Sequence, residues 1–247
     1  MQQLGLDIDP DLSADDKVAK IQEKLLKSIG DTYAIKGKWG SGMQTVVNTA
    51  LINAATNVDD HCLLKWLIAF EAGSDYLKDS YRQKLAGAVL NRKNCSMRYL
   101  HHKTHKGVYL KKKTTLRQII ASSNAFSFLN RKDRSNSVNS MKMLFMLNAK
   151  KGKVTKKDFF ATWKNKKTAN DMCNRWKNAN RALGPKGENI KNNEATHFWV
   201  DWVSKPSWHD DSKVVETVNH TNGTNTYFLK GIAYSIRVPM KDSDQTR

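Results

Sequence analysis

Apolar residues recur at helical spacing through most of the first hundred positions, between short polar or glycine-containing breaks. The first such segment opens with a capping box at Ser13 and Asp16. The pattern predicts helices over residues 13–30, 42–55, 59–73 and 75–100. We therefore expect residues 1–100 to form a helical domain that serves assembly or contact with a partner.

The period weakens over residues 101–136, which we interpret as a basic connector. Within it, the pattern allows a single helix over residues 116–129. Helical spacing resumes at residues 137–149, where Met141, Leu144 and Phe145 are predicted to point inward.

Two short helices are predicted over residues 155–184, because Thr-x-x-Asp occurs at Thr155 and again at Thr168. The spacing places a tight turn at residues 164–167. In the first helix Phe159, Phe160 and Trp163 are predicted to face inward. In the second, we expect an apolar face of Met172, Trp176, Ala179 and Leu183, with Cys173 beside it, and an opposite polar face of Asn170, Asn174, Lys177, Asn178 and Arg181.

Strand-like composition replaces the helical period after Gly184. Residues 196–203, 213–220 and 225–238 are rich in β-branched and aromatic residues. Asn222-Gly223 lies between the last two segments and is a strong hairpin signal. The predicted fold class is α+β, mainly α, with a helical N-terminal domain followed by a basic domain that ends in a β-hairpin.

Positive charge is confined to the middle of the chain. Residues 1–90 contain 10 Lys and Arg against 12 Asp and Glu, residues 91–185 contain 24 against 3, and residues 186–247 contain 8 against 8. Such a block repels itself in a compact state, so a polyanion is its natural counterpart. The charge therefore predicts nucleic-acid binding, with duplex DNA favoured and RNA possible.

The predicted order of helix, helix, turn, helix and strands resembles the winged-helix branch of helix-turn-helix domains, over about residues 137–238. The resemblance implies that residues 137–247 form a winged-helix-like nucleic-acid-binding domain. Asn and Arg can each bond a base edge through two atoms, which makes the polar face of the second helix the candidate base reader. The candidate phosphate contacts are Lys111, Lys112, Lys113, Lys150, Lys151, Lys153, Lys156, Lys157, Lys164, Lys166 and Lys167.

Other chemistry has weaker support in the sequence. Cys95, His101, His102 and His105 lack the paired spacing of zinc modules. A nuclease would have to draw on the acids of the tail, Glu188, Glu194, Asp201, Asp210 and Asp211, with His209. A stacking platform for single strands could use Trp199, Trp202, Tyr227 and Phe228. We expect no cofactor, metal or catalytic residue, and keep a sequence-tolerant RNA- or genome-coating protein and a metal-dependent nuclease as alternatives.

The composition also indicates the cellular compartment and the biological role of the protein. Three widely spaced cysteines, Cys62, Cys95 and Cys173, fit a reducing compartment. We expect a cytoplasmic, nucleoid-associated protein, or a nuclear one in a eukaryotic host, with no membrane partner and with a homo-oligomer or protein contact through residues 1–100. Its expected role is replication initiation or transcription regulation, and the excess of Asn and Lys indicates an A·T-rich genome such as that of a phage or mobile element.

Overall fold

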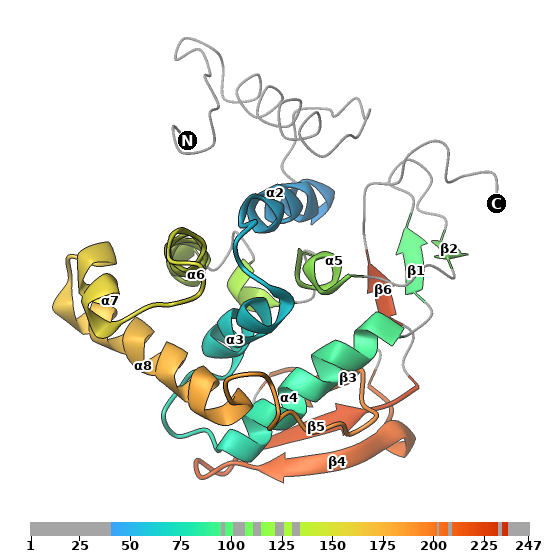
Figure 1. The fold of residues 1–247 in the computed structure, drawn as a ribbon. Helices are drawn as coiled ribbons and strands as arrows, with labels where there is room; N and C mark the ends of the chain where they lie inside the picture. The colour runs from blue at the N-terminus through green and yellow to red at the C-terminus, as the bar shows by residue number, and fades with distance from the viewer. Residues whose placement is uncertain are drawn as a thin grey trace.

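The computed structural model describes residues 41–94, 97–100, 107–110, 115–121, 126–129, 134–201, 203–206, 209–231 and 234–236, and these form a mainly helical molecule with small sheets (Figure 1). The α-helices are α2 (Ser41–Ala54), α3 (Asp60–Glu71), α4 (Asp79–Asn91), α5 (Leu116–Ala121), α6 (Arg134–Ala149), α7 (Lys156–Thr162) and α8 (Lys166–Leu183). The strands are β1 (Met97–Leu100), β2 (Gly107–Leu110), β3 (His197–Val200), β4 (Val214–Asn219), β5 (Asn225–Leu229) and β6 (Tyr234–Ile236). The prediction of a mixed, mainly helical fold is confirmed.

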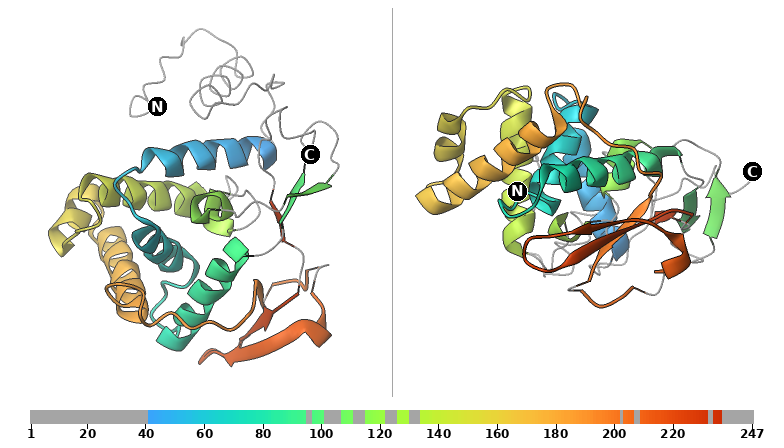
Figure 2. Two further views of the ribbon diagram at one scale, coloured as in Figure 1. Left: turned by 45° about the vertical axis from the view of Figure 1, so that its right-hand side comes forward. Right: turned by 90° about the horizontal axis from the view of Figure 1, so that it is seen from below.

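Helix α3 is the centre of the packing. Every residue from Leu63 to Phe70 is buried, so this helix is buried on all sides rather than along one stripe, and all of these residues except Lys65 are apolar. Trp66 contacts Phe70 and Phe128 edge to face, and its indole N–H donates to the carbonyl of Ser140 in α6 at 2.8 Å. Helices α6 and α8 both pack directly on α3 (Figure 2).

The C-terminal strands form an antiparallel sheet in the order β3-β5-β4. Strands β4 and β5 make the predicted hairpin, closed by a hydrogen bond from the His220 N–H to the Thr224 carbonyl at 2.8 Å. Gly223 in the turn has a φ of 83°, a conformation that glycine adopts without strain. The hairpin signal at Asn222-Gly223 is confirmed.

Three expectations are corrected, the first two of them by a second sheet. Strand β1 pairs antiparallel with β2 and parallel with β6. The helix predicted over residues 75–100 therefore ends at Asn91, and the strand predicted over residues 225–238 is divided between two sheets. The helix predicted over residues 116–129 stops at Ala121, and a short 3-10 turn, Ser127–Leu129, follows later. Pairing with distant strands overrides local periodicity in the first two cases.

One hydrophobic core runs from Ile52 in α2 to Phe228 in β5, across the predicted boundary near residue 100. Arg92, at the end of α4, links the parts: its Nε donates to the Thr196 carbonyl at 2.6 Å, and its guanidinium lies 5.4 Å from the ring centre of Phe126. The division of labour between residues 1–100 and 137–247 stays a prediction, but the two regions share this core. The predicted helix over residues 13–30 lies outside the described residues.

A buried carboxyl group in this core makes the stability depend on pH. Burial raises the pKa of Glu71 to about 7, against opposing effects of Arg92 and a hydrogen bond from the Ser127 backbone, and the Glu71 Oε1 atom has no hydrogen-bond partner among the described residues. Between its usual pKa and about 7, the folded state holds a proton that the unfolded state has released. Stability from this group is therefore present at low pH and is lost as the pH rises through 7.

We expect the free energy of unfolding to fall by about 2–3 kcal/mol between pH 5 and pH 8 because of Glu71. In Glu71→Gln this loss should disappear, which urea unfolding at the two pH values measures. An equal fall in the wild-type chain and the variant would contradict the assignment.

Candidate nucleic-acid interface

Helix α7 begins at the capping box that the sequence predicts. The backbone N–H and the hydroxyl of Thr155 donate to Asp158 at 2.8 and 2.7 Å. These bonds and the ammonium of Lys150, 2.9 Å away, hold the pKa of Asp158 well below its usual range. Phe159 and Trp163 are buried and Phe160 packs partly against the core, in agreement with the predicted inward face. The short helix is thus fixed at its start by polar bonds and along its inner face by aromatic packing.

The second helix of the pair begins earlier than predicted. Asn165, and not Thr168, is the N-cap of α8: its side chain accepts the Thr168 backbone N–H at 3.1 Å. Asp171, which was expected to complete a capping box, instead pairs with Arg175 at 3.0 Å. Asn caps a helix as well as Thr does, so the helix gains nearly a turn. Three residues, 163–165, separate α7 from α8, a length typical of helix-turn-helix units.

The inner face of α8 is the predicted one. Met172, Cys173, Trp176, Ala179 and Leu183 are all buried, and the helix packs on both α3 and α4. Four of these positions follow one another at steps of four, three and four, which fixes the rotation of the helix. The remaining surface of α8 is therefore also fixed.

The outer face differs from prediction at its C-terminal half. Asn178 is only 6% exposed, and its amide donates to the Gly73 carbonyl at 3.0 Å and to Asp75 at 2.7 Å. Arg181 is exposed, but it pairs with Asp79 through two hydrogen bonds of 2.7 and 3.1 Å. Asn178 is bound by the turn between α3 and α4, and Arg181 by the first residue of α4. Asn178 is therefore removed from the candidate base readers, and Arg181 is engaged within the chain.

Three of the predicted base readers are exposed and make no hydrogen bond or ion pair through their side chains to other described residues. Asn170, Asn174 and Lys177 follow one another at steps of four and three, so they form one stripe along α8. Lys166 and Lys167 lie at the start of the same stripe. Amide and ammonium groups therefore face solvent together along the first three turns of the helix.

Eight lysines at this end of the molecule have no carboxylate partner among the described residues. Residues 150–177 contain ten Lys and Arg and only Asp158 and Asp171 as acids. Lys150 and Arg175 take those two. The remaining lysines are exposed, and within the described part of the chain no ion pair reaches them; we call this set the lysine cluster: Lys151, Lys153, Lys156, Lys157, Lys164, Lys166, Lys167 and Lys177.

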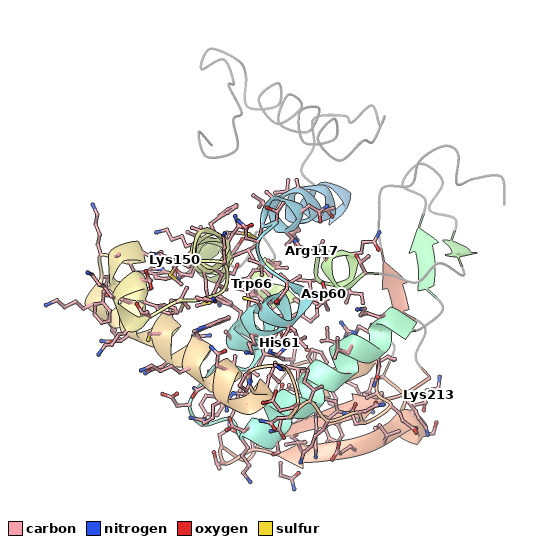
Figure 3. The ribbon with its side chains drawn as sticks, viewed as in Figure 1. Asp60, His61, Trp66, Arg117, Lys150 and Lys213 are labelled. Carbon is pink, nitrogen blue, oxygen red and sulfur yellow. The ribbon has the colours of Figure 1, made fainter. Side chains whose placement is uncertain are left out.

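Cations elsewhere on the surface are paired more often. Lys205 lies 2.8 Å from Asp211, Lys213 lies 3.7 Å from Asp210, and Lys230 lies 3.2 Å from Glu194. Figure 3 shows Lys213 on the sheet and Lys150 beside α6 and α7, on opposite sides of the molecule. The lysines without a carboxylate partner are therefore most concentrated, among the described residues, at the end formed by α7 and α8. Lys111, Lys112 and Lys113, which were also expected to contact phosphates, lie outside the described residues.

Two asparagines of α8 provide a matched test of its orientation. Asn178→Ala should lower the free energy of unfolding by about 1–3 kcal/mol, because it leaves a buried carbonyl and a carboxylate without their donor. Asn174→Ala removes an exposed amide and should change stability by less than about 0.5 kcal/mol. Chemical denaturation of both variants measures the difference. Equal losses would mean that α8 is rotated from the arrangement described.

The acids proposed for a nuclease are already engaged in the structure. Asp201 accepts the backbone and amide N–H groups of Asn225 at 2.9 and 2.8 Å, and Asp210 and Asp211 bond to Ser212 and Lys205. Among the described residues, no group of three or more His, Cys, Asp or Glu could hold a metal ion. Cys95, His101, His102 and His105 lie outside them.

Two of the four aromatic residues predicted as a stacking platform for single strands lie against each other in the structure. Trp199 and Tyr227 stack at 5.3 Å between ring centres, and the ring of His209 packs edge-on against Trp199 at 4.7 Å. Phe228 is fully buried on the opposite face of the sheet, and Trp202 is outside the described residues. Among the described residues, the predicted platform is thus a half-buried pair of rings.

A groove between α6 and α7 has no counterpart in the predictions. Its volume is about 670 Å³. The predicted inward position of Phe145 is wrong, because this ring lines the groove, and Met141 is shared between the groove and the core. Val138 is 49% exposed there. The full lining is Ser137, Val138, Met141, Lys142, Phe145, Met146, Ala149, Lys150, Asp158, Ala161 and Thr162.

Comparisons with known proteins identify no relative of this chain, so its function is inferred from the site geometry. Within the described part of the chain, no helix combines the length and apolar character needed to cross a bilayer. Searches against family models, curated proteins and solved structures find no match to this chain.

Proposed function

We propose that this protein binds duplex nucleic acid, with DNA favoured, through the end of the molecule formed by α7 and α8. The observation that carries the proposal is the lysine cluster, eight exposed ammonium groups without carboxylate partners in the described structure. A compact fold gains nothing from such a cluster and is destabilised by its self-repulsion. A row of phosphates supplies the missing negative charge and gains further from the release of condensed counterions.

The arrangement of α7 and α8 supports a helix-turn-helix mode of binding. A short helix, a three-residue connection and a long helix with an exposed polar stripe are the parts that place a recognition helix in a major groove. Asn170 and Asn174 have the chemistry to bond adenine, and Lys177 can reach a base or a phosphate. Lysines at both ends of α7 and at the start of α8 lie where a backbone would pass.

We propose the winged-helix resemblance only for the three helices α6, α7 and α8, and not for the β-hairpin. The hairpin lies elsewhere: Tyr81 of α4 packs on Phe228, and the Thr221 hydroxyl donates to the Tyr76 carbonyl at 3.3 Å. The sheet thus rests on α4 and on the turn that follows α3. In our proposal the sheet supports that turn, which binds Asn178, and the start of α4, which binds Arg181. The sheet itself makes no contact with DNA.

The proposed biological role is that of a replication initiator or transcription regulator, of the kind that a phage or mobile element encodes. Such a role requires preference for one sequence. A genome-coating protein with the same lysines would bind all sequences alike, so the exposed asparagines decide between the two. They favour the first role because amides contribute little to phosphate attraction and much to base recognition.

Selection of binding sites from random duplexes tests this role. We expect the full chain to enrich one motif, and Asn174→Ala to cost about 1–3 kcal/mol on that motif while leaving affinity for unrelated duplexes nearly unchanged. Arg175→Ala, which changes a partly buried ion-paired side chain of the same helix, is the control. Absence of enrichment, with equal affinity for all duplexes, would favour the coating protein.

A further inference from the structure

The groove between α6 and α7 is an unpartnered apolar surface beside the lysine cluster. Val138, Met141, Phe145 and Ala149 recur along α6 at steps of three and four, so an exposed apolar stripe follows this helix. Ala161 of α7 forms the facing wall. A continuous apolar surface of this kind in an otherwise charged region marks an interaction site.

Positive charge surrounds the groove. Lys142 and Lys150 are both exposed and form part of its lining. Asp158 is the acid of the lining, and its oxygens are already taken by Thr155 and Lys150. The lysine cluster continues from the groove through residues 151–157. An occupant must therefore combine apolar side chains with negative charge.

The chain itself contains a segment with this combination. Residues 4–16 carry Leu4, Leu6, Ile8 and Leu12, interleaved with Asp7, Asp9, Asp11, Asp15 and Asp16. No Lys or Arg occurs before residue 17. Five acids without one cation form the densest negative charge in the sequence, and they stand next to the apolar groups that such a groove accepts.

The connecting chain is long enough to reach. Asn57, just after α2, donates its backbone N–H to Asn148 at 2.8 Å, at the end of α6 that borders the groove. Helix α2 is about 20 Å long at 1.5 Å per residue, and the three residues from Ala54 to Asn57 add at most about 10 Å, so Ser41 lies within roughly 30 Å of this end. Residues 17–40 span about 35 Å even at the helical rise and about 80 Å when extended.

We propose that residues 4–16 dock in the groove between α6 and α7 and place their acids against the lysine cluster, where they compete with nucleic acid. The apolar side chains fill the groove, and the carboxylates approach Lys142, Lys150 and the lysines that follow. The segment is tethered, so its effective concentration reaches the millimolar range, and weak contacts suffice for occupancy. The competition rests on the proposed nucleic-acid binding, whereas the docking does not.

Two full-length variants separate docking from a general effect of charge. The quintuple change of Asp7, Asp9, Asp11, Asp15 and Asp16 to Asn removes the acids. The quadruple change of Leu4, Leu6, Ile8 and Leu12 to Ser keeps all the acids and removes the apolar groups. We expect both variants to bind a duplex at least about 5-fold more tightly than the wild-type chain at 0.1 M salt. If only the Asp variant gains affinity, the effect is one of net charge and the docking is refuted.

Docking is measured without nucleic acid by adding a fluorescent peptide of residues 1–16 to the full-length Ser variant. We expect the anisotropy to rise in a saturable, salt-sensitive manner, and to stay flat when Ala161→Trp fills the groove. A peptide carrying the five Asn changes is the control and should bind at least about 10-fold more weakly.

Other outcomes of these two experiments would contradict either the docking or the proposed function. No binding of the peptide, or binding that ignores Ala161→Trp, overturns the groove as the site. A sedimentation coefficient that rises with wild-type concentration, and falls back in Ala161→Trp, would make a second copy the occupant and overturn the proposal. Peptide binding with no nucleic-acid binding by any variant supports the docking and refutes the proposed function.

Discussion

Replacing Lys156, Lys157, Lys166 and Lys167 together by Gln should weaken binding to duplex DNA by on the order of 100-fold or more at 0.1 M salt. All four ammonium groups are exposed on α7 and the start of α8 and have no carboxylate partner in the described structure. Removing one lysine–phosphate interaction should flatten the slope of log affinity against log salt by about 0.9, so the four changes together should flatten it by about 3.6 units. Filter binding or anisotropy titrations from 0.05 to about 0.3 M salt measure both quantities.

A second quadruple variant removes the same charge from other places. Lys93, Lys205, Lys213 and Lys230 each pair with an acid, at 2.8 to 3.7 Å. Changing these four to Gln lowers the net charge equally, but it should change the salt slope by less than about 1 unit, because screening removes distant charges at this ionic strength. Equal losses in the two variants would mean that only the total charge matters and that the α7–α8 end is not the contact surface.

Trp176→Ala should lower the free energy of unfolding by about 3–5 kcal/mol, the range for removing a buried indole. Trp176 lies on the inner face of α8 with Met172 and Ala179, where the helix packs on α3 and α4. For a protein of this size, the melting temperature should fall by roughly 10 °C. Binding should be lost on heating at the same point as the fold, and differential scanning calorimetry together with a binding assay follows both.

Trp199→Ala is the matched control. Trp199 is half-buried on the outer face of the β3-β5-β4 sheet, where it stacks on Tyr227 and donates to the Val203 carbonyl at 3.0 Å. Its loss should cost less than half as much stability and should leave duplex binding intact at 25 °C. A Trp176→Ala protein that is as stable as the Trp199→Ala protein would contradict the packing of α8 described here.

Local patterns predicted α7 and α8 well because their signals lie within a few residues. The steps from Met172 to Leu183 fixed the buried face, and Thr155 with Asp158 fixed the start of α7. Asn178 had no such local signal: its partners Gly73 and Asp75 lie more than a hundred residues earlier in the chain. The sequence pattern does not show which polar residues of a helix face are buried by a segment that lies far away in the chain.

Strand β1 illustrates the same limit for the fold. Its residues, Met97–Leu100, follow α4 closely and continue a helical spacing, yet they pair with β2 and with β6 from the far end of the chain. Periodicity over four residues does not distinguish a helix from a strand. The groove between α6 and α7 was equally hidden, because the apolar stripe that lines it has the same spacing as a stripe that packs on a core.

Differential labelling of lysine amines tests most directly whether α7 and α8 form the nucleic-acid interface, because it measures the accessibility of each lysine in the intact chain separately. The full-length protein is labelled with and without a saturating duplex DNA, and the labelling ratio at each lysine is read by mass spectrometry. We predict strong protection at Lys156, Lys157, Lys164, Lys166, Lys167 and Lys177, and ratios near one at Lys84, Lys93, Lys205, Lys213 and Lys230. Protection centred on the second set, with the first set unchanged, would contradict the claim that α7 and α8 form the nucleic-acid interface.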